Sequence, residues 1–263
     1  METRGFQTPI SIFGKSSLLS KRTEIGSQKG SAKQPLCRMI SIVIPAHNEE
    51  AYLPRTLEAL KRQNYPNFEI IVVANGCTDA TVEVARDRCK RLIVLSQKNL
   101  GVARNLGARM AKGDLLVFLD ADTLLEPMTL RIIAQKFQPG DAAGTIKGEP
   151  DRSSPGYCFL YALKNFTHRT ALHCGSSGLI LCWKKDFEKI GGFDEGLEVR
   201  ENSELIWRLK KLGAYRYIGE VTATTSMRRY QQEGLGRMLR LWVKVWFQTH
   251  FGDLHRRHYE TVR

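Results

Sequence analysis

Two acidic residues, Asp120 and Asp122, lie two positions apart in the segment FLDADT, directly after the apolar run LLVFL. If the extended conformation of that run continued through them, both carboxylates would point to the same side of the chain. One or two carboxylates, together with substrate phosphates, are how proteins hold Mg²⁺ or Mn²⁺. A metal ion in such a place neutralises a departing diphosphate. The alternative is a solvated acidic strand end, and the spacing alone favours neither interpretation.

Three further segments carry polar side chains that could bind a ligand. In IPAHNEE, Asn48 and the acids that follow it stand at an expected helix start, where they could simply cap the helix. In VVANGCTD, Asn75 offers a donor and an acceptor suited to the edge of a nucleobase, although N-G is also an ordinary turn signal. Arg104 and Arg109 lie just before the acidic segment, where one could meet a phosphate. The alternative is a solvated basic face, which suits Arg109 better than Arg104.

The elements that position these residues follow from an alternation of short apolar runs and helical periods. Strands are expected at 40–45, 68–74, 91–95 and 114–120, and helices at 49–63, from about 79 to 89, and at 100–111. Such an alternation predicts a parallel sheet with helices on both faces. Ligands of these sheets bind at the carboxyl ends of the strands, so residues 45–48, 74–79 and 120–122 should gather along one rim.

The second half of the chain is less regular. It predicts strands at 178–183 and 214–218, a short helix and turn in KKDFEKIGGFDE, and a helix at 201–212. Arg228 and Arg229 stand beside hydroxyl groups in TSMRRY, which would suit a clamp for a diphosphate or an anionic acceptor, or an exposed basic turn.

The formal net charge of +13 is concentrated at the two ends of the chain. Residues 1–38 carry seven Lys and Arg against two acids, residues 226–263 carry eight against three, and the middle carries 25 against 22. We therefore do not expect the whole surface to bind nucleic acid. Instead we expect a basic end of the chain to contact phosphates or anionic lipid. Six cysteines without a C-x-x-C pair indicate reduced thiols in a cytoplasmic protein rather than a disulfide scaffold or zinc site. No apolar run is long enough to cross a bilayer.

The two ends also differ from the middle in pattern. Residues 1–38 show no helical or strand period and are expected to be a disordered or dispensable extension. Residues 231–263 are expected to form a basic C-terminal segment, with an amphipathic helix at 234–251. That helix could contact a membrane surface peripherally, or pack on the protein itself, and a single such helix favours packing. Its apolar stripe consists of Leu235, Met238, Leu239, Trp242, Val245 and Trp246.

In their order and spacing, the motifs SIVIPAHNEE, EIIVVANGCTDAT, NLGVARNLGARMAKGDLLVFLDADT, KKDFEKIGGFDE and ENSELIWRLKKLG resemble the family 2 glycosyltransferases. The resemblance covers residues 39–230. It implies the GT-A fold, an α/β architecture with a Rossmann-like, mostly parallel central sheet, divided into a nucleotide-binding half at 39–123 and an acceptor half at 124–230. It also implies transfer of a sugar from a UDP- or GDP-type donor to an acceptor hydroxyl, with Mn²⁺ or Mg²⁺ at the D-x-D motif.

The same resemblance assigns expected roles to individual positions. Asp122 would bind the metal with Asp120, which would also approach the ribose, and Arg104 would lie near the diphosphate. The acceptor side would include Phe193 and Asp194. The remaining donor-binding positions would be Pro45, His47, Glu49 and Asn75.

Two positions depart from the family pattern. Ala74 and Asn75 replace two acids at the second strand end. Asn202 replaces the Asp that serves as general base, and an amide cannot accept a proton at neutral pH. We expect the neighbouring Glu201 to take that role, whereas Glu204 is explained by an i,i+4 pair with Arg208.

Two alternatives follow from the same residues. One is a non-catalytic nucleotide-sugar-binding or membrane-surface protein, which Asn202 supports. The other is a nucleotidyltransferase, which would carry a Gly-rich phosphate loop that IPAHNEE lacks. The acceptor is open, since lipid-linked and soluble acceptors both fit the basic C-terminal segment.

Overall fold

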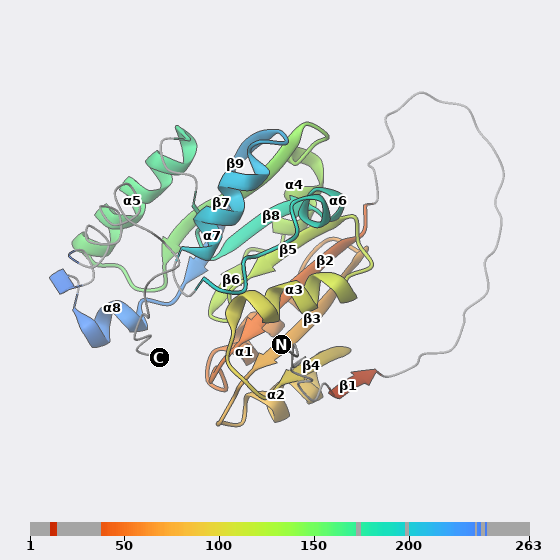
Figure 1. Ribbon diagram of the computed structural model, residues 1–263. Helices are drawn as coiled ribbons and strands as arrows, with labels where there is room; N and C mark the ends of the chain where they lie inside the picture. Colours follow the sequence, from red (N-terminus) through yellow and green to blue (C-terminus); the bar gives the residue numbers. More distant parts are fainter. Residues whose placement is uncertain are drawn as a thin grey trace, which may run out of the picture.

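The computed structural model describes residues 11–14, 38–171, 175–197, 200–234, 236–237 and 240, and the structural statements below concern these residues. Their strands form one sheet in the order β1-β4-β3-β2-β5-β8-β7-β9-β6, with helices on both faces (Figure 1). The strands are β1 Ser11–Gly14, β2 Ile40–Ala46, β3 Phe68–Asn75, β4 Arg91–Leu95, β5 Leu115–Leu119, β6 Thr123–Leu125, β7 Asp141–Pro150, β8 Leu179–Trp183 and β9 Ala214–Thr225. The helices are α1 Leu53–Lys61, α2 Thr81–Arg88, α3 Leu100–Met110, α4 Thr129–Lys136, α5 Pro155–Arg169, α6 Lys184–Lys189, α7 Glu201–Leu209 and α8 Arg228–Glu233.

The first half of the sheet is parallel, as the sequence predicts. β2 pairs in parallel with β3 and with β5, and β3 pairs in parallel with β4. Because helices cover both faces, alternate residues of one strand enter two different cores: Ile42 and Ile44 pack in one, and Val43 in the other. On the second face α3 lies very close to the sheet, since a Cβ at Gly107 would stand 2.3 Å from the Val43 side chain.

The second half of the sheet is mixed. β8 pairs antiparallel with β5 and β7, β9 pairs in parallel with β7, and β6 pairs antiparallel with β9. The expected strand at 214–218 extends to Thr225, and the expected helix at 201–212 ends at Leu209. The sequence did not predict β6, β7, α5 or α8. The mixed α/β architecture is confirmed: strands β2, β3, β4 and β5 pair with one another only in parallel, whereas the strands of the acceptor half pair in both directions.

The chain ends add two observations. β1 lies within the extension at 1–38, where the sequence shows no strand period; it pairs antiparallel with β4 and forms one edge of the sheet. The expected helix at 234–251 falls mostly outside the described residues. Among the described helices, none combines the length and apolar character that crossing a membrane requires.

Candidate functional site

The loops that follow β2 and β3 are joined to each other by hydrogen bonds. His47 Nδ1 donates to the carbonyl oxygen of Asn75 at 2.8 Å. Asn48, in the left-handed region at φ 53°, accepts from the backbone N–H of Thr78 at 2.9 Å. The backbone N–H of Glu49 donates to the Thr81 hydroxyl at 2.7 Å. The strand ends therefore gather along one rim, as the parallel order predicts.

Pro45 is tolerated in a central strand because of where the pairing of β2 stops. β2 pairs with β5 only as far as Val43, whereas it pairs with β3 as far as Ala46. Pro45 lies beyond the last residue paired with β5, where a missing N–H removes no bond to that strand. The chain can therefore leave the sheet toward His47.

Asn75 is buried, with 2% of its surface exposed. Its side-chain oxygen accepts from the backbone N–H of Asn99 at 2.8 Å, and Asn99 in turn caps α3 by accepting from Val102 N–H at 3.0 Å. Asn75 thus links the end of β3 to the start of α3. That link is a positioning role, and contact with a nucleobase stays a prediction.

Asp120 and Asp122 stand on a turn, not on a continued strand. β5 ends at Leu119, and the N–H of Thr123 donates back to the carbonyl of Asp120 at 3.2 Å. The condition under which the two carboxylates would share a side is therefore not met. They have different cationic partners: Asp120 lies 3.3 Å from Arg104, and Asp122 lies 3.4 Å from Arg228.

Arg104 is the centre of the first of these two groups. Its side chain is 3% exposed, so it does not belong to a solvated basic face. Besides Asp120, it donates to Glu201 at 3.2 Å and to the side-chain oxygen of Asn202 at 2.7 Å. The Phe193 ring lies 5.0 Å from the guanidinium carbon. The buried Arg104 side chain thus joins the end of β5 to the start of α7. Its acidic and amide partners supply the ion pairs and hydrogen bonds that a buried guanidinium requires.

The first turn of α7 holds Asn202, the second of the two departures from the family pattern. Asn202 donates to the Ser176 hydroxyl at 3.1 Å while it accepts from Arg104, so both ends of its amide are bound. Glu201 keeps a carboxylate at the same helix start. Glu204 forms the expected pair with Arg208, at 2.5 Å, and this confirms its structural explanation.

Arg228 is the centre of the second group. It forms an ion pair with Glu49, lies near Asp122, and its guanidinium carbon stands 4.2 Å from the Tyr52 ring centre. Burial opposes its charge, but the bond to Glu49 and the charge of Asp122 raise the pKa of Arg228 above its ordinary value. Arg229 instead lies 3.5 Å from Glu233 of its own helix. Of the two expected clamp arginines, Arg228 is the one that contacts these acids.

Asp194 belongs to a separate loop. Its carboxylate accepts from the N–H of Gly196 at 2.9 Å. The same loop is held by Asn105, which is hydrogen-bonded to both the N–H and the carbonyl of Phe193, at 2.8 and 2.9 Å. This loop therefore supports the Phe193 ring against Arg104, and the contact of Asp194 with an acceptor stays a prediction.

Lys164 of α5 is a site residue that the sequence analysis missed. Burial lowers the pKa of Lys164 to about 8, and the negative charge of Asp120 opposes that shift. Its ammonium lies 5.4 Å from the Tyr161 ring centre. No sequence signal marks Lys164, because the helix that carries it was itself not predicted.

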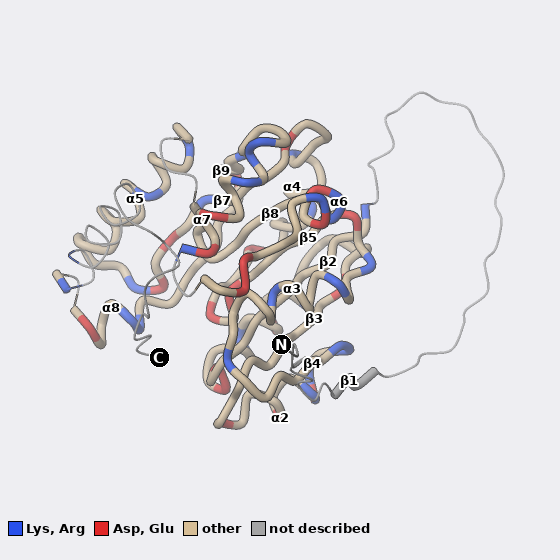
Figure 2. Tube along the Cα trace, in the orientation of Figure 1, with Lys and Arg blue, Asp and Glu red and all other residues tan. Residues whose placement is uncertain are grey.

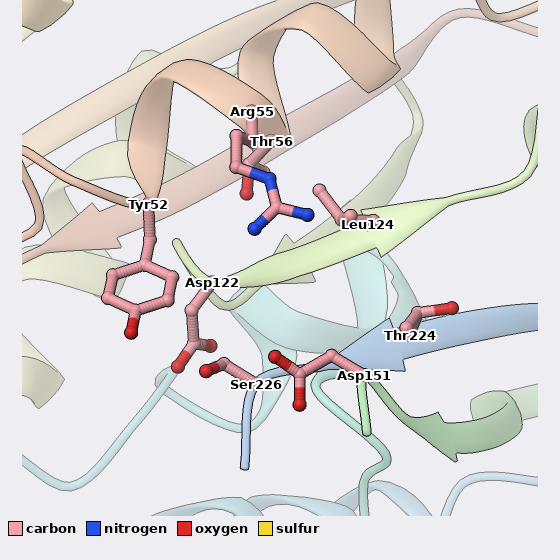
Figure 3. Close-up of a pocket in the computed structure, with 8 residues that line it drawn as sticks. All are labelled: Tyr52, Arg55, Thr56, Asp122, Leu124, Asp151, Thr224 and Ser226. Carbon is pink, nitrogen blue, oxygen red and sulfur yellow. The ribbon is translucent and has the colours of Figure 1, made fainter. Parts of the chain in front are cut away.

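A shallow, solvent-open depression lies beside Asp122. Figure 3 shows Asp122, Asp151 and Ser226 around it, with Arg55 extending toward it from α1. Within the described residues, no group of three or more His, Cys, Asp or Glu side chains could by itself hold a metal ion. A cation here would depend on Asp120 or Asp122 together with ligands from a substrate.

Comparisons with known proteins agree with this geometry. Residues 41–188, more than half of the chain, match the model of a family described as Glycosyl transferase family 2. An uncharacterized glycosyltransferase of Haemophilus influenzae is 30% identical over 182 residues, which are 65% of this chain and 62% of that protein. Validoxylamine A glucosyltransferase of Streptomyces hygroscopicus subsp. limoneus is 40% identical over 136 residues, 48% of this chain and 28% of that protein. The chain spans less than two thirds of the length of the first curated relatives that it matches.

Solved structures show the same fold. A mannosyltransferase from Pyrobaculum calidifontis, solved with GDP-Man and Mn²⁺, superposes with a TM-score of 0.60 at 20% identity and covers 85% of this chain and 68% of its own. TarS 1–349 of S. aureus, solved with UDP-GlcNAc, has a TM-score of 0.56 at 21% identity and covers 71% of this chain and 58% of its own. These likenesses confirm the GT-A architecture.

Proposed function

The chain belongs to glycosyl transferase family 2, and on that premise we propose that it transfers a sugar from a nucleotide-diphosphate donor to an acceptor hydroxyl. The observation that carries this proposal is the Arg104 group. It joins Asp120, at the end of a central strand, to Glu201 and Asn202 of the acceptor half. The Arg104 guanidinium thereby holds Asp120, a carboxylate of the donor side, and Glu201, a candidate general base, in fixed positions.

The donor would bind along the rim formed by Pro45, His47, Glu49 and Asn75. The hydrogen bonds between the β2 and β3 loops support this assignment, because they fix the loops before a ligand arrives. The nucleobase of the donor is proposed to be uracil or guanine, since the similar structures hold UDP-GlcNAc and GDP-Man.

Mn²⁺ or Mg²⁺ is proposed as the cofactor at the D-x-D motif. The residues fit such an ion in their chemistry, because Asp122 and Asp120 offer hard oxygen ligands. Asp122 would hold the ion and Asp120 would support it. When bound, the ion would offset the charge of the departing diphosphate.

Glu201 is proposed as the general base for the acceptor hydroxyl. Asn202 cannot accept a proton, and its amide is already bound to Arg104 and Ser176. Glu201 has its carboxylate in the same helical turn, held by Arg104 at 3.2 Å. The acceptor is either lipid-linked or soluble, and the compartment is proposed to be the cytoplasm, with peripheral contact at a membrane.

The test is a thermal-shift screen of UDP-, GDP- and dTDP-sugars with and without Mn²⁺, followed by detection of released nucleotide. We expect one nucleotide to stabilise the protein only when the metal is present. Asp122→Asn should lose the metal-dependent shift. The matched control Asp87→Asn, on the exposed face of α2, should keep it. Absence of a shift with every donor would contradict the proposal.

A second candidate is favoured by one specific observation, the amide at position 202. A non-catalytic nucleotide-sugar-binding protein would show the same thermal shift but release no nucleotide from any donor. The family match weighs against the nucleotidyltransferase alternative.

A further inference from the structure

Helix α5, Pro155–Arg169, presents its apolar residues outward. Six large hydrophobic side chains are exposed among the described residues, and three of them lie on one face of this helix. They are Phe159, Leu163 and Phe166, with exposed fractions of 72%, 50% and 56%. Their i, i+4, i+7 spacing makes a continuous stripe, which Cys158 and Ala162 widen.

The opposite face of α5 is polar and is fixed to the sheet. The Asn165 amide donates to the carbonyl of Gly148 at 2.8 Å and accepts from its N–H at 2.9 Å. The His168 ring lies 3.3 Å from the Ser177 hydroxyl, and both are buried. Rotating the helix to bury its stripe would break these bonds. The outward apolar face is therefore built into the fold.

The charge around the stripe is positive. α5 carries Lys164 and Arg169 and no acidic residue, and Figure 2 shows the absence of acidic positions along it. The exposed Arg152 precedes the helix, beside the equally exposed Asp151, so the positive charge near the stripe comes mainly from the helix itself and from the arginines after α8. Neighbouring α8, whose Tyr230 ring lies 6.1 Å from that of Tyr157, leads to further arginines, although Glu233 balances part of their charge.

We propose that α5 is a docking surface for an anionic lipid bilayer. Phenylalanine and leucine on one side, with basic residues at the ends, are the pattern of a helix that lies in the membrane interface. The polar face, which such a helix ordinarily turns to water, here binds the protein body. The stripe would enter the acyl boundary while the sheet stays outside it.

A second copy of this chain fits the surface less well. Two copies would bring together chains with a net charge of +13 each. Three side chains on one helix also provide far less than the roughly 1,200–2,000 Å² of total buried area found in stable interfaces.

Docking through α5 would bring the bilayer near the candidate site, because the Tyr157 ring of this helix lies 6.1 Å from the Tyr230 ring of α8, the helix that also carries Arg228. Only this consequence, which favours a lipid-linked acceptor, rests on the proposed function. Binding to vesicles needs neither a donor nor turnover, so the two proposals fail independently.

The test is co-sedimentation of the full chain with vesicles of phosphatidylcholine, with and without phosphatidylglycerol. The triple variant Phe159→Ser, Leu163→Ser, Phe166→Ser removes the stripe. The matched control Met128→Ser, Trp207→Ser, Leu212→Ser removes the three other exposed large hydrophobic residues. We expect wild type to bind the anionic vesicles, the α5 variant to bind at least about tenfold more weakly, and the control to bind as wild type does.

Five results would overturn the proposal. One is equal vesicle binding by the α5 variant, and another is equal loss in the control. A third is a wild-type dimer, measured by light scattering, that the α5 variant converts to a monomer, since a second copy would then cover the stripe. The fourth is a wild type that binds no vesicles. The fifth is an α5 variant that melts well below the control, since the chain itself would then cover the stripe.

Discussion

Arg104 brings a buried positive charge between acceptors from distant parts of the chain: Asp120 from the end of β5, and Glu201 and Asn202 from α7. A lysine keeps the charge but lacks the planar fork that reaches several acceptors at once. We expect Arg104→Lys to lower turnover at least about tenfold and to cost roughly 1–3 kcal/mol of stability, because acceptors lose their donors. Steady-state kinetics and urea unfolding measure the two effects.

The control for that substitution lies on the same helix. Arg109 is exposed, so Arg109→Lys should change stability by less than about 0.5 kcal/mol and leave turnover intact. If Arg104→Lys and Arg109→Lys had the same turnover and the same stability, the hydrogen bonds of Arg104 would not contribute to function.

Glu201 and Glu204 allow a matched test of the general base, since both stand in the first turn of α7. Glu201→Gln should keep donor affinity and lower kcat roughly 10²–10⁴-fold, because the amide cannot accept the acceptor's proton. Glu204→Gln removes only the pair with Arg208 and should leave kcat within a few-fold of wild type. Normal turnover in Glu201→Gln would reject the assignment.

Arg228 competes with any cation for the carboxylates that surround it, since it pairs with Glu49 and lies 3.4 Å from Asp122. Arg228→Gln leaves these acids without that counter-charge. We expect the affinity for Mn²⁺ alone to rise about tenfold, a change of ~1.4 kcal/mol. Calorimetric titration with MnCl₂ measures it. Arg229→Gln, whose partner is Glu233, should bind the metal as wild type does, and equal affinity in both variants would place the cation elsewhere.

At the scale of elements, Asp79 fixes the start of α2. It accepts from the N–H of Thr81 at 3.0 Å and from the N–H of Glu50 at 3.2 Å. Burial acts to raise the pKa of Asp79, but the bonds from Thr81 and Glu50 dominate and lower it below 3.8. A carboxyl group with a lowered native pKa stabilises the fold above its unfolded pKa, and this stabilisation disappears as the pH falls through the native value.

Asp79→Ala should therefore cost about 1 kcal/mol near neutral pH. The difference from wild type should shrink as the pH falls below about 4, when both chains carry an uncharged side chain at this position. Urea unfolding across that range measures it. Asp87→Ala, on the exposed face of α2, should show no such dependence. A cost that stays constant with pH would mean that the charge of Asp79 contributes nothing.

The elements differ in how well the sequence predicted them, for physical reasons. β2, β3, β4 and β5 are apolar runs because helices bury both of their faces, and this pattern is visible without a structure. The sequence of β7 is DAAGTIKGEP, and its small residues and lysine do not form the apolar run that indicates a buried strand. A Cβ at Gly144 would lie 2.7 Å from the carbonyl of Arg216, so this position excludes the bulky residues typical of strands. α5 was missed because apolar residues stand on both of its faces, Tyr161 on the buried face and Phe159 on the exposed face, so the sequence shows no single apolar stripe.

The candidate site divides in the same way. The strand-end residues were predictable because parallel strands end at one rim, and His47 and Asn75 do meet there. The partners of Arg104 on α7 and the partners of Arg228 were not, because they lie 97 to 179 positions away along the chain. Whether Asp120 and Asp122 share a side depends on a turn that no local pattern specifies.

At the scale of the whole molecule, the two halves of the sheet share one core. Leu181 of β8 is fully buried; it pairs with Val117 in the nucleotide-binding half and with Gly144 in the acceptor half. The same cluster contains Ile44 of β2 and Ile146 of β7. A core that crosses the boundary between the halves predicts that they unfold together.

Leu181→Ala tests this prediction, because the cavity it creates lies where both halves meet. We expect a loss of roughly 2–5 kcal/mol, with tryptophan fluorescence and far-ultraviolet circular dichroism giving coincident urea transitions in wild type and variant. Leu163→Ala, half exposed on α5, should cost less than about 0.5 kcal/mol. Two separated transitions in the variant would show that each half holds its own structure. In that case the relative positions of Asp120 and Glu201 would depend on the docking of two separately folded units. A single transition means that one core fixes Asp120 and Glu201 relative to each other.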